Sequence, residues 1–277
     1  MKKTEVKTYE LDISNRNLPP GSLNILFITD LHGTCREKDA VRKILKDISG
    51  IRPDVILIGG DLIVRRYPDT FAKSAAFAAK LTSFAPVYYT YGNHEKKCGN
   101  PLFRKYTEKL QSYGISFLLN RNVRIMINGV PVRIFGYDLD LPYYQKIRHQ
   151  DLPVSDIYEK LGKPDDRCIN ILLAHHPRFH EQYIQWGADL TLCGHYHGGV
   201  MRLGGNRGLI SPDFRLFPDD SYGEIENNGK HVIISSGAGE HTVPFRIFNP
   251  REIVQVRINV RDDTSCRRQD VQQDFNI

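Results

Sequence analysis

Five short polar motifs follow five apolar runs along the chain, and each contains side chains that can bind a metal ion. The motifs are TDLH with Asp30 and His32, GGD with Asp61, GNHE with Asn93 and His94, AHHP with His175 and His176, and GHYH with His195 and His197. One such motif says little, because a single histidine is more often a surface or hydrogen-bonded residue. Five polar clusters at five strand ends would leave buried groups unsatisfied unless something such as a cation gathers them.

The spacing of the motifs predicts that neighbouring ligands address one ion. In extended backbone, residues two positions apart point to the same side, as in D-x-H and H-x-H. Imidazole, carboxylate and amide oxygen without thiolate suit manganese, iron or zinc rather than a structural zinc or a calcium site. The seven candidate ligands are Asp30, His32, Asp61, Asn93, His175, His195 and His197. They exceed the needs of one ion, so we expect two divalent ions, and a carboxylate such as Asp61 could bridge them over ~4 Å.

The elements that must position the first motifs follow a β-α-β pattern. Apolar runs of strand length at residues 23–28, 55–58 and 87–90 alternate with helices expected over 38–48 and 70–83. Strands and helices that alternate in this way predict a largely parallel sheet with helices packed on it. The ends of such strands are where ligands bind.

Antiparallel pairing is expected further along the chain. A helix near 102–113 precedes two apolar runs, 123–127 and 132–135, which flank the hairpin signal Asn128-Gly129. Later elements are a strand over 169–174, a helix over 178–186, a strand over 189–193, irregular structure over 198–230, and closing strands over 232–235 and 253–258. We expect a single domain over residues 1–260 and a polar C-terminal tail over 261–277.

Composition narrows the function classes. Lys and Arg number 38 and Asp and Glu 32, a net charge of +6, and these charges are scattered without a nucleic-acid-binding pattern. The basic N-terminus lacks a following apolar segment, and no apolar run reaches the roughly 20 residues of a membrane helix, so we expect a soluble protein. Five cysteines without C-x-x-C spacing argue against a disulfide framework and favour a reducing cytoplasm.

The five motifs, in order, resemble the calcineurin-like metallophosphoesterase family, whose pattern is D-x-H, G-D-x-x, G-N-H-[ED], a later H and G-H-x-H. The phrases GHYHGG and SSGAGEHTVPFRIFNPREI further resemble its bacterial YkuE/YaeI-like branch, so the similarity covers nearly the whole chain. The resemblance implies an α/β fold, a four-layer α/β/β/α sandwich with two mixed sheets. It assigns one ion to Asp30, His32, Asp61 and His197, and the other to Asp61, Asn93, His175 and His195.

The expected activity is hydrolysis of a phosphomonoester, phosphodiester or pyrophosphate, with a water or hydroxide between the two ions as the nucleophile. His94 resembles the family's non-ligand histidine, which protonates the leaving oxygen or hydrogen-bonds the phosphoryl group. His176 points away from His175 in extended backbone, so only one of them is expected to be a ligand, and the resemblance favours His175. We consider His176, His241 and Arg246 as substrate contacts.

Two other functions fit the same residues: a non-catalytic metal-binding scaffold of this fold, and a nuclease. The complete ligand set argues against the scaffold, and the dispersed positive charge argues against the nuclease. The branch is similar to enzymes that act on lipid-linked or sugar-nucleotide pyrophosphates. Four aromatic residues, Tyr143, Tyr144, Phe214 and Phe217, could reach an acyl chain in peripheral contact with a membrane, with core or lid packing as their alternative role.

Overall fold

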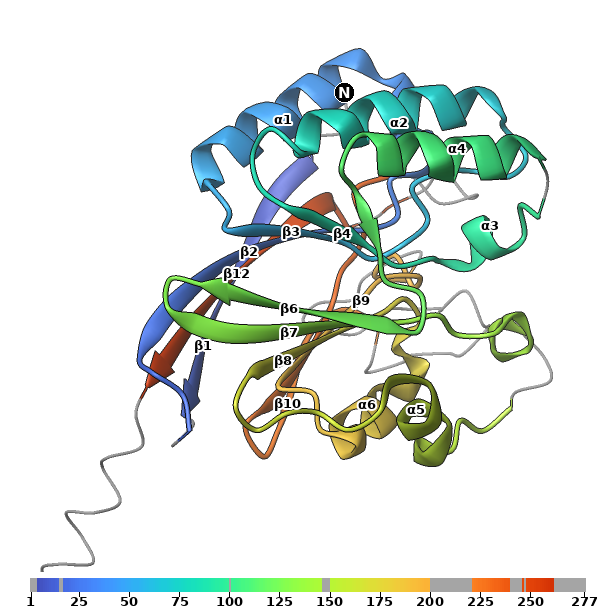
Figure 1. Ribbon diagram of the computed structural model, residues 1–277. Helices are drawn as coiled ribbons and strands as arrows, with labels where there is room; N and C mark the ends of the chain where they lie inside the picture. The colour runs from blue at the N-terminus through green and yellow to red at the C-terminus, as the bar shows by residue number, and fades with distance from the viewer. Residues whose placement is uncertain are drawn as a thin grey trace, which may run out of the picture.

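The computed structural model describes residues 4–14, 17–99, 101–145, 150–199, 221–239, 246 and 248–261. They form two six-stranded sheets that pack face to face, with helices on both outer faces (Figure 1). This arrangement confirms the expected four-layer α/β/β/α sandwich with two mixed sheets.

The first sheet has the strand order β1-β12-β2-β3-β4-β5. Its strands are β1 (Thr4–Ser14), β2 (Gly21–Ile28), β3 (Val55–Ile58), β4 (Val87–Tyr89), β5 (Ser116–Phe117) and β12 (Arg251–Arg261). Strands β2 to β5 run parallel, and β12 pairs antiparallel with β2 and parallel with β1. Helices α1 (Lys38–Ile51), α2 (Asp69–Leu81) and α4 (Pro101–Ser112) cover its outer face (Figure 1). The predicted β-α-β alternation is therefore confirmed.

The second sheet has the order β10-β11-β9-β8-β7-β6. Its strands are β6 (Arg121–Ile127), β7 (Val130–Tyr137), β8 (Ile169–Ala174), β9 (Leu190–Cys193), β10 (Gly223–Asn227) and β11 (Lys230–Ile234). Helices α5 (Val154–Leu161) and α6 (His180–Trp186) cover it from outside (Figure 1). The predicted hairpin is confirmed, since Asn128 and Gly129 have φ angles of 49° and 83° between the antiparallel strands β6 and β7.

Strands β1, β5 and β10 were not expected from the sequence, and two of them show why. Strand β1 forms at the N-terminus, where no strand was expected; Tyr9, Leu11 and Ile13 alternate there with exposed polar residues and face the core. Strand β10 lies within the segment expected to be irregular. It is a half-exposed edge strand, which weakens its apolar pattern, but the Asn228-Gly229 turn after it carries the same hairpin signal as the earlier pair. Residues 200–220 lie outside the described part.

Three apolar layers hold the sandwich together. Phe27 and Ile171 belong to the layer between the sheets, Ile44 to the layer under α1, α2 and α4, and Trp186 to the layer under α5 and α6. Within the described ranges, we find no helix with the length and apolar character needed to cross a membrane. Strand β12 ends at Arg261, one residue inside the expected tail, and residues 262–277 are not described.

Candidate metal centre

Strand ends from both sheets bring the seven predicted ligands together. Four short helical segments surround them: η1 (His32–Arg36), α3 (Asn93–Lys96), η2 (Leu141–Tyr144) and η3 (Pro177–Phe179). Three groups have ligating atoms that all lie within 4.8 Å of one another: Asp30 with His32 and His197, His32 with Asp61 and His94, and Asp61 with His175 and His195. His32 and Asp61 each belong to two groups, so the three groups form one continuous cluster.

The backbone at these strand ends is left-handed and not extended. The φ angles are 53° at Asp30, 45° at His32, 52° at Asp61, 67° at His195 and 51° at His197. The expectation that extended backbone pairs the ligands of D-x-H and H-x-H is therefore wrong. Left-handed backbone costs a residue other than glycine about 1–2 kcal/mol. Such strain concentrates at ligand sites, where the surrounding structure maintains it.

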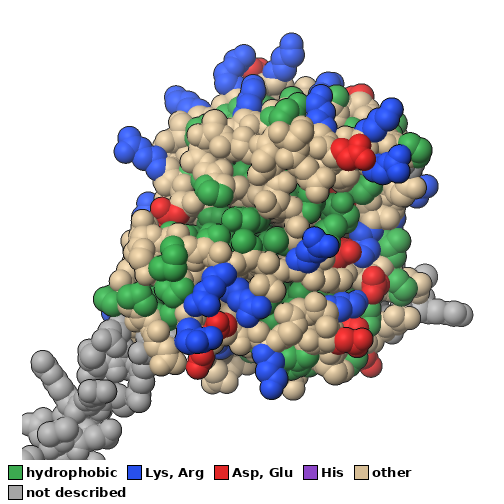
Figure 2. All heavy atoms as spheres, in the orientation of Figure 1, with side chains coloured by type: hydrophobic (Ala, Val, Ile, Leu, Met, Phe, Trp, Pro, Cys, Tyr) green, Lys and Arg blue, Asp and Glu red, His purple; other side chains and the backbone are tan. Residues whose placement is uncertain are grey.

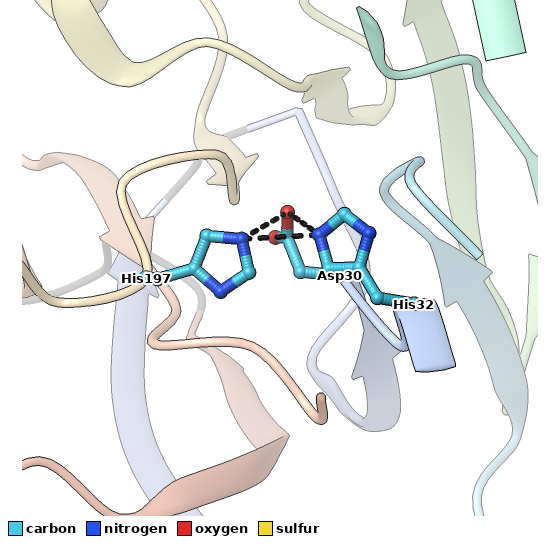
Figure 3. Close-up of side chains that lie close together, drawn as sticks. All are labelled: Asp30, His32 and His197. Carbon is cyan, nitrogen blue, oxygen red and sulfur yellow. Dashed lines mark hydrogen bonds and ion pairs between the residues drawn. The ribbon is translucent and has the colours of Figure 1, made fainter. Parts of the chain in front are cut away.

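Asp30, His32 and His197 converge on one point (Figure 3). Nε2 of His197 lies 3.2 Å from Asp30 Oδ1, and Nε2 of His32 lies 3.6 Å from the same oxygen. The two Nε2 atoms are 3.1 Å apart. The other carboxylate oxygen of Asp30 accepts hydrogen bonds from Thr29 Oγ1 and the His195 backbone N–H. Oδ1 makes no hydrogen bond within the described residues, so an acceptor stands buried at the centre of the group.

Asp61 and His175 form the core of the second group. Nδ1 of His175 donates to the Gly59 carbonyl at 2.6 Å, which leaves the Nε2 lone pair for a ligand. That Nε2 lies 3.4 Å from Asp61 Oδ2 and has no hydrogen-bond partner in the described part of the chain. Asp61 Oδ1 accepts a hydrogen bond from the His94 backbone N–H at 2.8 Å. One oxygen of Asp61 is thus anchored while the other faces the histidines.

Asn93 turns its amide oxygen toward other acceptors. The oxygen lies 3.3 Å from Asp61 Oδ2 and 2.9 Å from Nδ1 of His195. Without an ion, an amide rotated by 180° would donate hydrogen bonds to both. With a divalent cation among the three acceptors, the orientation with the oxygen inward is the favourable one. This oxygen and the unpartnered Asp30 Oδ1 and His175 Nε2 fit a divalent metal ion.

The protonation states of the cluster depend on burial and on the carboxylates of Asp30 and Asp61. Burial opposes protonation of His175, but the charges of Asp61 and Asp30 outweigh it and raise the pKa of the ring to about 9. Burial would raise the pKa of Asp61, yet His175 and His94 hold it well below its usual range. For His197, burial dominates and lowers the pKa to about 3. The two carboxylates thus favour the protonated form of His175 in the ion-free cluster, and an ion would have to displace that proton to bind at Nε2.

His94 lies beside the cluster and is half-buried. Its ring centroid is 4.9 Å from that of His32, in an edge-on arrangement. Burial lowers the pKa of this imidazole. Because His94 belongs to one of the three groups, its position allows it to act either as a metal ligand or as a proton donor.

His176 is buried against the cluster but lies outside the three groups. Its Nδ1 accepts a hydrogen bond from the Arg178 backbone N–H at the start of η3. Its ring centroid lies 4.4 Å from that of His195. The structure therefore brings His176 against a candidate ligand rather than among the ligating atoms.

Arg246 is directed at the loop between β11 and β12. Its Nη2 donates to the carbonyls of Ser236, at 2.8 Å, and Gly239, at 2.5 Å, and lies 3.2 Å from Nδ1 of His197. Arg246, which was predicted to contact substrate, is thus hydrogen-bonded to the backbone and lies next to the candidate ligand His197. His241, the third predicted substrate contact, lies outside the described residues.

Two residues that support the cluster were given no role by the sequence analysis. The buried carboxylate of Glu95 accepts from the backbone N–H groups of Asp61, Leu62 and Gly92. Its signal was the last letter of GNHE, three residues after Gly92. Asn249 donates from Nδ2 to the His197 carbonyl at 2.6 Å and to the Gly199 carbonyl at 2.7 Å. No pattern in the sequence around Asn249 predicts this supporting role.

Residues 23–199 match the family model described as calcineurin-like phosphoesterase, a span that contains all seven candidate ligands. The chain belongs to this family. It is therefore a metallophosphoesterase, a hydrolase of phosphoester bonds, and its His and Asp groups indicate binding of divalent metal. The unpartnered acceptors of the cluster agree with that chemistry.

Three curated relatives span most of the chain. YpbG of Bacillus subtilis is 27% identical over 252 residues, which cover 89% of this chain and 84% of YpbG. An uncharacterised metallophosphoesterase of Helicobacter pylori strain J99 is 30% identical over 244 residues, covering 85% of this chain but only 60% of that protein. The phosphodiesterase YaeI of Escherichia coli is 25% identical over 225 residues, covering 78% of this chain and 74% of YaeI. The similarity to YaeI agrees with the expected branch.

Proposed function

We propose that the chain hydrolyses a phosphodiester with two divalent ions held at the strand ends of its two sheets. The observation that carries this proposal is the position of Asp61, which belongs to two of the three ligand groups. Its Oδ2 lies 3.4 Å from Nε2 of His175 and 3.9 Å from Nε2 of His32. A carboxylate that faces histidines of both groups suits a bridge between two ions. The name of the relative YaeI, a phosphodiesterase, supports the diester class.

Two ligand sets would hold the ions. One consists of Asp30, His32, Asp61 and His197, and the other of Asp61, Asn93, His175 and His195. Two divalent ions, when bound, lower the pKa of a coordinated water and offset the charge of the phosphoryl oxygens. The mixed nitrogen and oxygen donors suit manganese, iron or zinc.

His94 supplies the proton in this proposal. Its backbone N–H donates to Asp61 Oδ1, and its ring lies 4.9 Å from the His32 ring, beside the cluster. Burial lowers the pKa of His94, so the negative charge of a bound diester is needed to keep the ring protonated for this role. Placed next to a bound diester, the ring donates to the leaving oxygen.

The test compares hydrolysis of p-nitrophenyl phosphate, bis(p-nitrophenyl) phosphate and a lipid pyrophosphate, each with Mn²⁺ and with a chelator. We expect metal-dependent turnover that is fastest with the bis-ester. Equal turnover in chelator would contradict the metal-dependent mechanism. A metal-loaded protein that is inactive on all three would favour the non-catalytic scaffold, and preference for the pyrophosphate would replace the diester class.

Nuclease action is the second candidate, and the surface gives it little support. On the face drawn in Figure 2, Lys and Arg side chains are spread from the upper helical layer to the lower one and do not form a continuous stripe. Nucleic-acid-binding proteins usually concentrate this charge along one face.

Membrane contact through aromatic residues likewise has limited support. Tyr144 is buried and Tyr143 packs edge-on against Phe179, which supports packing of these rings in the protein over their exposure to a membrane. Phe214 and Phe217 lie outside the described residues.

A further inference from the structure

Tyr144 is a phenol buried among the histidines of the second sheet. It ends the short helix η2, and only 8% of its surface is exposed. Its ring centroid lies 5.1 Å from that of His176, 5.2 Å from that of His195 and 6.2 Å from that of His175. One aromatic ring therefore covers the histidines that follow β8 and β9.

The hydroxyl of Tyr144 is buried and has no hydrogen-bond partner among the described residues. Other buried tyrosines near the centre are satisfied: Tyr89 donates to Glu95 at 2.7 Å, and Tyr183 donates to the His176 carbonyl at 3.1 Å. Burying a hydroxyl without a partner is unfavourable, and phenylalanine would fill the same space without that cost. A hydrogen-bond partner for the Tyr144 hydroxyl would therefore have to come from a bound ligand.

Ion pairs hold η2 in place against the opposite sheet. Lys96, three residues after Asn93, lies 2.9 Å from Asp138 and 3.5 Å from Asp140, just before η2. Lys160 of α5 also pairs with Asp140, at 2.8 Å. Because α3 follows β4 of the first sheet and α5 covers the second, Tyr144 is fixed relative to ligands from both sheets. A donor held in this way needs little reorganisation when a ligand binds.

The groups around Tyr144 indicate which kind of atom its hydroxyl can bind. A phenol is protonated at neutral pH and donates one hydrogen bond. The cluster beside it consists of metal-ligating acceptors, which an ion would occupy. A phosphoryl group bound at those ions brings additional acceptor oxygens to the same place.

We propose that the Tyr144 hydroxyl donates a hydrogen bond to a non-bridging oxygen of the phosphoryl group bound beside His175 and His195. This inference rests on the proposed phosphodiester hydrolysis and adds a substrate-contacting residue from η2 to it. No proton is transferred, since the hydroxyl keeps its hydrogen and only orients and stabilises the phosphoryl oxygen.

The decisive variant is Tyr144→Phe, which keeps the ring against the histidines and removes only the hydroxyl. In the Mn²⁺-loaded protein, we expect the Kd for inorganic phosphate, measured by calorimetry, to rise about tenfold or more, as for loss of a hydrogen bond to a charged oxygen. The kcat/KM for bis(p-nitrophenyl) phosphate should fall by a similar factor. Metal content should stay unchanged, and the ion-free variant should resist urea at least as well as the wild type.

The matched control is Tyr143→Phe, which removes the neighbouring hydroxyl on the same turn and should leave the Kd for phosphate unchanged. A Tyr144→Phe protein with wild-type phosphate affinity and intact metal content would overturn the inference. Loss of metal from that variant would also overturn it, because Tyr144 would then be a ligand. If the wild type hydrolyses no phosphoester but Tyr144→Phe still weakens phosphate binding, the proposed function fails and the hydrogen bond stands.

Discussion

The carboxylate of Glu95 accepts a hydrogen bond from the backbone N–H of Asp61 at 2.8 Å. It also accepts from the N–H groups of Leu62 and Gly92 and from the hydroxyl of Tyr89. Glu95 thus joins the end of β3 to the start of α3. The last residue of GNHE thereby shapes the left-handed turn that presents the central carboxylate of the site.

Replacing Glu95 by Gln should weaken both the fold and the metal centre. A neutral amide cannot accept as many of these hydrogen bonds, so a buried N–H loses its partner, at a cost of about 2–3 kcal/mol in the free energy of unfolding. Urea unfolding in chelator measures this loss, and a Mn²⁺ titration measures the weaker binding. Glu108→Gln on α4, where the side chain is exposed, is the control. Equal stability of the Glu95→Gln and Glu108→Gln proteins would contradict the role of Glu95.

Gly92→Ala should disrupt the site by steric conflict. A Cβ atom at Gly92 would lie 2.2 Å from Asp61 Oδ1 and 2.8 Å from the Asp61 backbone nitrogen, so the turn itself would have to move. We expect loss of bound metal and a lower melting temperature. Gly33→Ala is the matched control, because a Cβ there meets nothing within 4 Å although Gly33 follows His32. Normal metal content in Gly92→Ala would show that the turn can adjust.

Asp61→Asn should lower the occupancy of both ions, because Asp61 belongs to two ligand groups. His197→Ala should mainly affect one ion, since His197 belongs to a single group. Elemental analysis after gel filtration gives the number of ions per chain for each variant. Two ions retained by Asp61→Asn would rule out the bridging role.

Metal uptake should release protons and weaken as the pH falls. The carboxylates of Asp61 and Asp30 outweigh burial and raise the pKa of His175 to about 9, so the ion-free ring is protonated below that pH. A histidine ligand must be neutral, and an ion therefore displaces this proton. Between pH 8 and pH 6, the apparent affinity for Mn²⁺ should fall by about tenfold per unit for the one proton released. Calorimetry in buffers of different ionisation enthalpy counts the protons, and a count of zero would contradict this assignment.

His94→Ala should reduce turnover while metal content stays near normal. The loss should be greater for a diester with an alkyl leaving group than for bis(p-nitrophenyl) phosphate, because a poor leaving group depends more on protonation. A drop of about 10²–10⁴-fold on the alkyl ester fits general acid catalysis. If the variant loses its metal instead, His94 is a ligand in the group with His32 and Asp61.

The sequence predicted where the ligands come together but not how the backbone presents them. The buried strands β2, β3 and β8 consist of apolar runs that end at TDLH, GGD and AHHP, so both the strands and their ends were readable. The left-handed φ at Asp30 and Asp61 was not, because aspartate does not require it. The backbone hydrogen bonds from Asp30 to Gly60 and from His32 to Asp61, which join neighbouring strand ends, hold that conformation.

The supporting contacts escaped prediction for a related reason. Asn249 reaches the His197 carbonyl from 52 positions away, and Lys96 pairs with Asp138 across the site. Neither contact leaves a periodic or local pattern. Glu95 is the exception, because its place three residues after Gly92 is typical of a carboxylate that caps a helix.

Each of the two proposed ligand sets combines residues from both sheets, and His32 and His197 are 165 positions apart in the chain. An ion between them would act as a reversible cross-link that closes a very long loop and so restricts the unfolded chain, as a disulfide does. We therefore expect the lifetime of the protein, and not only its activity, to follow the metal supply. When metal is scarce, we expect proteases to degrade the ion-free protein before the metal-loaded protein.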